Sequence, residues 1–511
     1  MEESRADSMR KTTLLVTVIV LVSKVCGFVR EMIMAAYFGA SASSDAFSMA
    51  YGIFYVLVMI FTSCISSTFI PQYSKELRNR DEDGANKYTN NILHLFGIVA
   101  IIISILGVIF APAIIKVVAS GYKGEQLELT LQLTKMIFPA LLFYVVAVIF
   151  SSLLNARKKF VAPQLVGFAM SIGILLCVIP FSGTFGILSA GYGTILAGIL
   201  QVVVLVPFLK GIYSYKPTLN VRDESVKQSL KLALPALFGM TITEINYLIN
   251  KALGSGLVVG SVTALNYAYK LVTFVVGVFV VPIVTILFSK LSELAAKGDK
   301  QGIKDGVKQN IEMISMIILP ITAIALVMSY EVISVVYEHG SFDSAATLLT
   351  NSAFVYYILG FIGFGIRELF TRAFYSVEDT KTPMIIGVIS IGINIVLNII
   401  LVKYMQVGGL ALASSISAIV AAVMLLLCFR RKMGSMGMKD TTIEMLKIAV
   451  AAVACGVITY FVRMKIGIDS TFIKLIVCAG VGVLSYAVIV MVLKVKEVKN
   501  LVGELTSRIK K

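Results

Sequence analysis

Charged residues are scarce in this chain of 511 residues: they make up 14% of it, whereas apolar residues make up 58%. Soluble globular proteins are about a quarter charged and about half apolar. Many apolar runs exceed the roughly 18 residues that mark a candidate transmembrane helix. The composition therefore excludes a soluble enzyme, a nucleic-acid-binding module and a disordered scaffold.

Metal-binding and redox motifs are also missing. The chain has two His and six Cys, and the Cys residues stand singly in apolar runs, with no C-x-x-C pair. We expect them to be small buried residues rather than disulfides or zinc ligands. No G-x-x-x-x-G-K-[ST] loop occurs, so the chain is not expected to hydrolyse ATP. We expect a membrane transporter rather than an enzyme. We expect no cofactor, and an ion gradient, the membrane potential or substrate flux would supply the energy.

Polar or Gly/Pro-rich breaks divide the chain into about fourteen apolar spans. They predict helices, because barrel strands would alternate in pieces of about ten residues. The expected fold is therefore an all-α integral membrane protein with about 14 transmembrane helices. The glycines from Gly191 onward predict close helix packing rather than a nucleotide site. The spans run near 13–37, 45–70, 91–118, 127–154, 165–182, 186–209, 229–253, 259–289, 309–337, 346–371, 384–402, 408–429, 442–462 and 471–493.

The distribution of Lys and Arg predicts the orientation. If the N-terminus is cytoplasmic, the cytoplasmic segments hold 32 Lys and Arg residues and the external loops hold four. Basic residues are enriched on the cytoplasmic side of membrane proteins. Both termini are therefore expected in the cytoplasm, where the basic residues face anionic lipid headgroups. This placement accounts for the net charge of +16 without nucleic acid.

The second half of the chain resembles the first at an offset of about 220 residues. The run from Ala46 resembles the run from Ala264, and Pro163 and Pro383 each open a span after a cytoplasmic turn. Chance similarity of two apolar stretches is the alternative. Parallel repeats of this kind usually place a binding site between two lobes that rock to give alternating access. We expect two pseudo-symmetric six-helix lobes, 1–210 and 211–432, followed by two extra helices and a cytoplasmic tail in 433–511.

Several ionisable residues fall inside spans, where an uncompensated charge costs several kcal/mol. In the first span, Ser23, Lys24, Gly27, Arg30 and Glu31 share one arc of about 120°. This arc is expected to face a cavity while apolar residues face lipid. A purely structural ion network is the alternative. The basic residues clearly within spans are Lys24, Arg30, Lys135, Lys251, Lys270 and Arg367.

Other intramembrane polar residues extend this candidate site. Asp45 opens the second span and could balance a cation near its outer end. Lys270 is the deep cation of the second lobe, as Arg30 is of the first. Arg367 lies toward the cytoplasmic end of the tenth span, where it could contact a headgroup or simply extend to the interface. A cavity with excess basic groups suits an anionic substrate such as a phosphate, whereas a cation exporter needs carboxylates.

Amides form a separate polar group. Asn250 lies in the seventh span, and Asn394 and Asn398 lie at i, i+4 in the eleventh. Amides at this spacing more often join helices by hydrogen bonds than bind ions.

Three motifs are familiar. The run SKVCGFVREMIMAAYFGASASSDAFSMAY from Ser23, FIPQYSKE from Phe69 and RAFYSVEDTKTP from Arg372 closely resemble signatures of the MurJ/MviN family. This family belongs to the multidrug/oligosaccharide-lipid/polysaccharide exporter superfamily, and the resemblance covers the first twelve spans.

The resemblance implies a lipid II flippase of the bacterial cytoplasmic membrane. Such a protein moves undecaprenyl-pyrophosphate-linked peptidoglycan precursor from the inner to the outer leaflet. Its partners would be this lipid-linked glycan, membrane lipids and proteins of cell-wall synthesis. Carried over by position, Arg30, Glu31 and Asp45 match family residues, and Lys24 and Lys270 stand where Arg is common.

Two departures from the family pattern leave alternative functions open. The second span has no Arg near Val58, where many members carry one. The residues Asn250, Asn394 and Asn398 fall where some members build a cation site with carboxylates. The rivals are an exporter of another polyprenyl-linked glycan and a non-transporting scaffold paralogue of envelope assembly.

Overall fold

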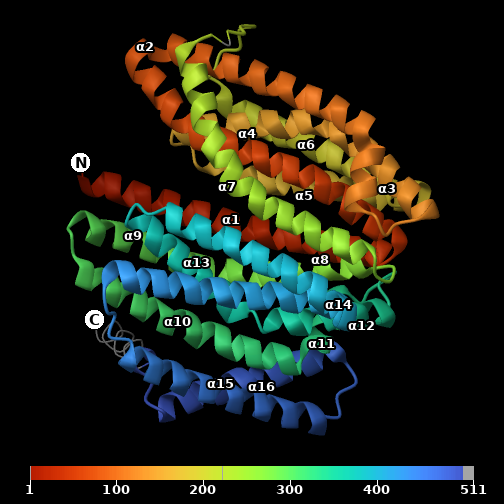
Figure 1. Cartoon of the computed structure of the whole chain (residues 1–511), viewed down its shortest axis with the longest axis vertical. Coiled ribbons are helices and arrows are strands. Elements are labelled where there is room, and N and C mark those ends of the chain that lie inside the picture. The colour runs from red at the N-terminus through yellow and green to blue at the C-terminus, as the bar shows by residue number, and fades with distance from the viewer. Residues whose placement is uncertain (1, 221, 499–511) are drawn as a thin grey trace. The chain divides into compact units, whose positions relative to one another are not determined.

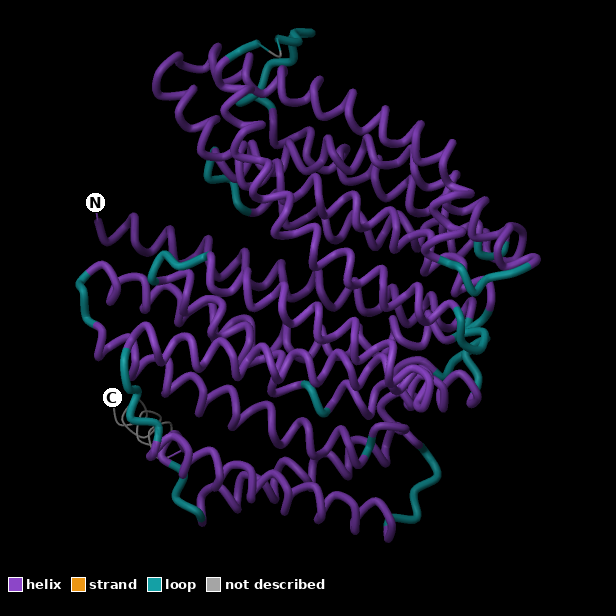
Figure 2. Tube along the Cα trace, viewed as in Figure 1, coloured by secondary structure: helices purple, strands orange, loops and turns teal. Residues whose placement is uncertain are grey.

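The computed structural model describes residues 2–220 and 222–498, and their side chains except those of 2–14, 17, 234–243 and 245. Figure 2 shows helices joined by short loops, with no strand in this part of the chain. Long apolar segments form helices because a helix satisfies its backbone hydrogen bonds internally. The predicted all-α fold is confirmed.

The chain divides into two compact units, Met1–Thr263 and Ala264–Lys511. The first unit runs from the red end of the colour bar in Figure 1 to α7. Its helices are α1 (Glu2–Phe38), α2 (Ala42–Val118), α3 (Gly124–Ile137), the short 3-10 helix η1 (Phe138–Ala140), α4 (Leu141–Ala156), α5 (Val161–Phe185), α6 (Leu188–Leu209) and α7 (Glu224–Ser255).

The second unit takes in nearly all of α8 and the remaining helices. These are α8 (Ser261–Val275), the π-helical turn η2 (Val276–Val280), α9 (Val281–Ala296), α10 (Lys300–Val327), α11 (Ser329–Tyr337), α12 (Ser344–Ile358), α13 (Phe361–Ser376), α14 (Lys381–Met433), α15 (Lys439–Lys465) and α16 (Thr471–Val492).

Two of the helices are interrupted. Helix α2 has non-helical backbone at Arg80 and Asp81, inside the predicted cytoplasmic segment 71–90. Helix α14 has a non-helical residue at Gln406, inside the predicted external break. Each helix therefore covers two predicted spans, and α5 and α14 begin two residues before Pro163 and Pro383, as expected.

Nine helices of the described residues are long and apolar enough to cross a membrane, or ten if the bent pair α12 and α13 is one span. Helices α1 and α7 lie over the predicted first and seventh spans but are not among these. The protein is therefore a multi-span membrane protein, and the count of 14 stays a prediction.

Helices α5 and α6 pack closely at their glycines. A Cβ on Gly173 would lie 2.5 Å from the Cα of Ala197, and a Cβ on Gly193 would lie 2.7 Å from the Cα of Ile174. Small residues allow this approach of two backbones in a membrane. The packing role predicted for the glycines from Gly191 onward is confirmed.

The segment 210–220, which follows α6, is fixed along α2. Asn90 Nδ2 donates to the carbonyl of Ser214 at 3.1 Å, and Asn91 Oδ1 accepts from the amide of Asn220 at 2.9 Å. The His94 ring bonds the carbonyl of Thr218 at 2.8 Å. Helix α7 also packs against α2, so it belongs to the first unit. The sequence repeat instead assigns α7 to the start of the second lobe. The lobe boundaries 1–210 and 211–432 stay a prediction.

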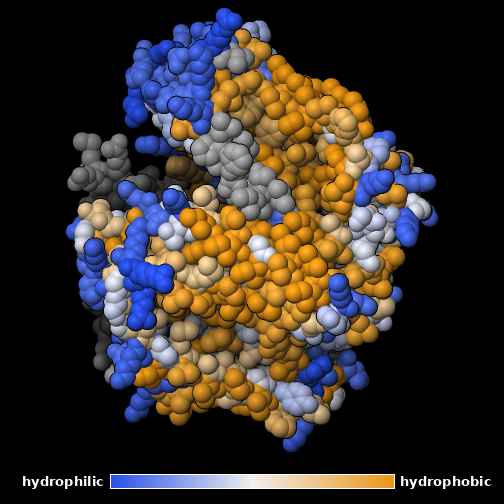
Figure 3. Space-filling view, viewed as in Figure 1, coloured by the Kyte–Doolittle hydropathy of each residue, from blue (hydrophilic) through white to orange (hydrophobic). Residues whose placement is uncertain are grey.

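Outward-facing apolar residues follow helical spacing. Ile98, Ile102, Ile105 and Ile109 of α2 have exposed fractions of 43 to 62%. Val22, Val25 and Val29 of α1, on the predicted lipid face, are also exposed. Figure 3 shows hydrophobic surface along helix sides and hydrophilic residues gathered at helix ends and loops. Such faces are stable in lipid because lipid tails are as apolar as they are.

The charge distribution predicts that the loop 290–308 is cytoplasmic. In a cysteine-free background, a Cys at Ser292 should react with a membrane-impermeant thiol reagent only after the cells are permeabilised. A Cys at Lys403, in a predicted external loop, should react in intact cells and serves as the matched control. Labelling of the Ser292→Cys variant in intact cells would refute the orientation.

Candidate functional site

A buried ion pair lies in α1. Arg30 exposes 8% of its surface, and its Nη2 donates to Oε1 of Glu31 at 2.6 Å. Tyr51 of α2 and Tyr144 of α4 lie close enough to interact with Arg30 electrostatically. Tyr144 in turn donates to the carbonyl of Thr194 in α6 at 3.2 Å. Side chains of α1, α2 and α4 therefore act on one guanidinium, and Glu31 compensates its charge where an unpaired charge would be costly.

The rest of the predicted polar arc of α1 has two environments. Lys24 is exposed. Ser23 and Gly27 face α5, since a Cβ on Gly167 would lie 2.3 Å from the Ser23 Oγ, and a Cβ on Gly27 would lie 4.0 Å from the Ser171 Oγ. The small residues of this arc therefore make room for a neighbouring helix.

Asp45 is almost completely buried, with 1% of its surface exposed. Its Oδ2 accepts from the amide of Gly260 at 2.7 Å, and its Oδ1 accepts from the amide of Thr263 at 2.8 Å. These amides lie at the N-terminal end of α8, where unpaired N–H groups and the helix dipole favour a negative charge. Gly260 has φ +90°, and a Cβ there would lie 2.4 Å from the carbonyl oxygen of Ala40. The Asp45 carboxylate thus holds the start of α8. The backbone at position 260 can approach Ala40 this closely because glycine has no Cβ.

Lys251 of α7 is the nearby cation, and sequence reasoning gave it no role. It exposes 5% of its surface, and its Nζ donates to the carbonyl of Ser48 and lies 4.7 Å from the ring centroid of Tyr247. Its charge also acts on Asp45. Asp45, Ser48 and Gly52 follow i, i+3, i+7 spacing on one face of α2, but this spacing does not indicate which helix packs against that face.

Two predicted cations lie in the second unit. Lys270 is half-buried in α8, and its carbonyl accepts from the Thr273 hydroxyl at 2.9 Å. Arg367 is exposed on α13, with its guanidinium carbon 5.8 Å from the ring centroid of Phe364. Lys24, Arg30, Glu31 and Asp45 belong to the first unit. Of these four, Arg30 and Glu31 form an ion pair, whereas Asp45 accepts from the backbone amides of Gly260 and Thr263.

The amides behave in part as helix-joining groups. In α14, Asn398 Nδ2 donates to Asn394 Oδ1 at 2.9 Å, and Asn394 Nδ2 lies 3.4 Å from the Ser414 hydroxyl beyond the kink. Asn250 is half-buried in α7 of the first unit. Within the described part of the chain, no three His, Cys, Asp or Glu side chains are placed to hold a metal ion.

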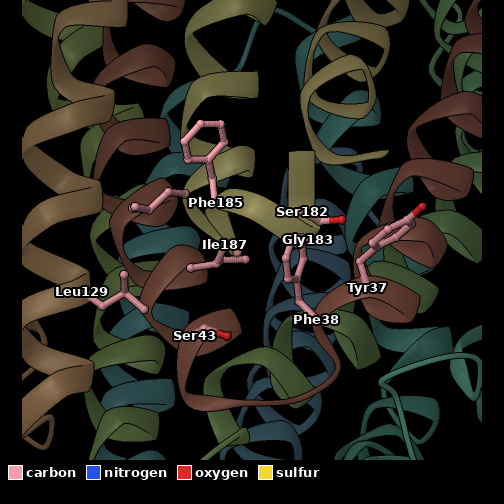
Figure 4. A pocket seen from close by; sticks show the side chains of 10 residues that line it. Tyr37, Phe38, Ser43, Leu129, Ser182, Gly183, Phe185 and Ile187 are labelled. Carbon is pink, nitrogen blue, oxygen red and sulfur yellow. The ribbon is translucent and has the colours of Figure 1, made fainter. Parts of the chain in front are cut away.

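The first unit also has a hollow of about 510 Å³ where α1 and α5 end and α2 and α6 begin. Figure 4 shows the side chains of Leu129, Phe185 and Ile187 around it, with the hydroxyls of Ser43 and Ser182. None of the predicted cations lines it. An apolar lining of this kind does not suit an anionic group, so it is separate from the predicted site.

The position of Gly52 gives a test of the Lys251 contact. A Cβ on Gly52 would lie 2.8 Å from the Lys251 Nζ, which must then leave the Ser48 carbonyl. We expect Gly52→Ala to destabilise the protein by about 1–3 kcal/mol. Gly27→Ala is the matched control: its Cβ meets no atom closer than 4.0 Å, and replacing this helical glycine should raise stability by about 0.4–1 kcal/mol.

The measurement is the temperature at which buried thiols such as Cys64 become accessible to a thiol-reactive dye in the purified protein. Equal melting temperatures for the two alanine variants would show that Lys251 relocates without cost.

Comparisons with known proteins agree with one another. A family model described as "Lipid II flippase MurJ" matches residues 34–478. A probable lipid II flippase MurJ of Borreliella burgdorferi is 27% identical, covering 94% of this chain and 95% of the relative. Another, of Vibrio cholerae, is 26% identical, covering 97% and 98%.

Solved structures show the same relation. A lipid II flippase MurJ in an inward closed conformation matches with a TM-score of 0.79 and 25% identity, covering 94% of this chain and 98% of that one. An inward-facing multidrug resistance MATE transporter of the MOP superfamily shares the fold, with a TM-score of 0.71 at 15% identity over 83% of this chain and 99% of that one. With a family model that matches most of its length, the chain belongs to the lipid II flippase MurJ family.

Proposed function

We propose that this protein is a lipid II flippase, which moves the undecaprenyl-pyrophosphate-linked peptidoglycan precursor from the inner to the outer leaflet by alternating access. The observation that carries the proposal is the family match over residues 34–478, which extends from α1 to α16 and takes in parts of both compact units. The shared fold with a MATE transporter supports a transport mechanism rather than an enzymatic one.

The chemistry of the intramembrane residues supports an anionic substrate. Arg30 is held by one acidic side chain in an otherwise apolar and phenolic setting, and Lys270 is a second deep cation. A pyrophosphate carries the opposite charge and accepts charge-assisted hydrogen bonds from Arg and Lys. The proposed substrate-binding set is Lys24, Arg30, Glu31, Asp45, Lys270 and Arg367.

Within this set, Asp45 has a positioning role. It accepts two backbone hydrogen bonds at the end of α8 and interacts with Lys251, so both of its oxygens are already engaged. We infer that it fixes the start of α8, the helix that carries Lys270, and does not contact phosphate itself.

The location that goes with this function is the bacterial cytoplasmic membrane, with both termini in the cytoplasm and proteins of cell-wall synthesis as partners.

Complementation tests the function against its rivals. We expect the protein to restore growth and cell shape to a bacterial strain depleted of its lipid II flippase. An exporter of another polyprenyl-linked glycan, or a scaffold paralogue, would reach the membrane at normal abundance without restoring growth. That result would reject the proposal.

The paired cations give a sharper prediction. Removing Arg30 or Lys270 loses a charge-assisted contact worth roughly 1.5–3 kcal/mol, or about 10- to 150-fold in affinity. Arg30→Ala and Lys270→Ala should therefore abolish complementation while the protein stays in the membrane at normal abundance. Lys270→Arg should be tolerated, because the guanidinium keeps the positive charge and can donate two parallel hydrogen bonds to a phosphate. Wild-type flipping by both alanine variants would show that the cations are structural.

We also propose that Asn250, Asn394 and Asn398 join helices and do not hold a coupling ion. Amides lack the negative charge that favours sodium in a membrane site. Transport in proteoliposomes should then be unchanged when choline replaces sodium. A steep sodium dependence would show that these positions bind a cation despite their missing carboxylates.

A further inference from the structure

The end of α14 carries cations in a surface hollow. Arg430 and Arg431 line a hollow of about 430 Å³ together with Leu427 and Ser435. Lys304 of α10 reaches the same region, since its Nζ lies 3.6 Å from the place a Cβ on Gly434 would take. All of these residues belong to the second unit. Two guanidinium groups, a hydroxyl and a nearby ammonium therefore meet at one helix end.

The third cation of this helix end is already neutralised. Lys432 Nζ lies 2.7 Å from Oδ2 of Asp379. Partial burial opposes ionisation of Asp379, but hydrogen bonds from Lys432 and Thr382 outweigh it and hold its pKa below the usual value. Arg430 and Arg431, by contrast, form no ion pair or side-chain hydrogen bond with any residue that the structure describes, and both are exposed.

An apolar stripe leads to the two arginines along α14. Ile419, Val423 and Leu427 have exposed fractions of 38%, 48% and 50%, and they recur every four residues. Successive residues at this spacing lie on one face of a helix, and Arg430 continues that face one turn further. Lipid tails would cover the stripe, and the phosphate of the same lipid would then lie at the level of the arginines.

We propose that Arg430 and Arg431 bind the phosphate of an anionic phospholipid in the cytoplasmic leaflet, with its acyl chains along Ile419, Val423 and Leu427. Guanidinium forks match the oxygens of a phosphodiester, and basic pockets near the cytoplasmic ends of membrane helices suit such headgroups. The arginines lie on an exposed face of one helix, beside bulk lipid. A bulk phospholipid is therefore the chosen occupant, rather than free phosphate or the lipid-linked pyrophosphate of the proposed substrate.

Native mass spectrometry of the purified full chain tests this site. Phosphatidylglycerol is titrated against the wild type, and phosphatidylethanolamine is the neutral comparison. Each basic side chain near an anionic lipid contributes about a fivefold preference. The double variant Arg430→Gln/Arg431→Gln should therefore bind phosphatidylglycerol about 10- to 30-fold more weakly, with phosphatidylethanolamine unchanged. The matched control Lys432→Gln should change phosphatidylglycerol binding less than about twofold, since its charge is already paired.

Two further arms separate the sources of phosphate. Inorganic phosphate at constant ionic strength should not displace phosphatidylglycerol, because it lacks the acyl chains. Undecaprenyl pyrophosphate binding should survive the double variant. Equal phosphatidylglycerol binding by wild type and double variant, displacement by inorganic phosphate, or selective loss of undecaprenyl pyrophosphate would each overturn the proposal. An unchanged melting temperature of the double variant shows that it is folded.

Discussion

The cost of placing charge among apolar helices is the constraint on which the rest of this structure depends. In lipid, an ionised side chain must be paired, hydrogen-bonded or near an interface. The chain meets this requirement differently at each site. Arg30 is paired with the adjacent Glu31, Lys251 donates to a backbone carbonyl, and Asp45 accepts from the first amides of α8. The contacts of Lys251 and Asp45 each join two distant segments, so at these two residues compensation of charge also holds helices of the first unit together.

The same constraint distinguishes residues that position helices from residues that are available to bind a ligand. Asp45 and Lys251 have their polar atoms engaged by protein groups, so neither is available to a ligand without breaking a buried contact. Arg30 has one acidic partner and phenolic neighbours, and its remaining guanidinium donors are the groups that the proposed phosphate contact would use. Arg367 is exposed on α13. Members of one predicted set therefore differ in what they can do chemically.

The fold was largely predictable because it depends on composition and on local rules. Long apolar runs gave helices, and the polar segments near Arg80 and Gln406 marked the interruptions of α2 and α14. The glycines of α6 were correctly read as packing residues. The helical phase of α1 separated Val22 and Val25, which are exposed, from the buried Arg30, but Lys24 of the same predicted polar arc is exposed as well.

The site was less predictable, because its contacts join residues about 200 positions apart. Nothing local to Lys251 indicates that its ammonium reaches Ser48, and nothing local to Asp45 indicates that it accepts from Gly260. Such pairings depend on how two helices cross. The packing of α7 with the first unit also depends on distant contacts, because amide side chains of α2 bind the segment before α7. The repeat pattern reports similarity of sequence and does not indicate these contacts.

The space at Gly52 has an evolutionary consequence. Because the Lys251 ammonium occupies the volume that a side chain at position 52 would need, the two positions are not free to vary independently. A larger residue at 52 displaces the Lys251 ammonium from the Ser48 carbonyl, so a substitution at 52 costs less stability when a shorter side chain already stands at 251. Positions in contact co-vary in protein families for this reason. Among homologues, we therefore expect a lysine at position 251 to occur with glycine at position 52, and loss of the lysine to release the glycine.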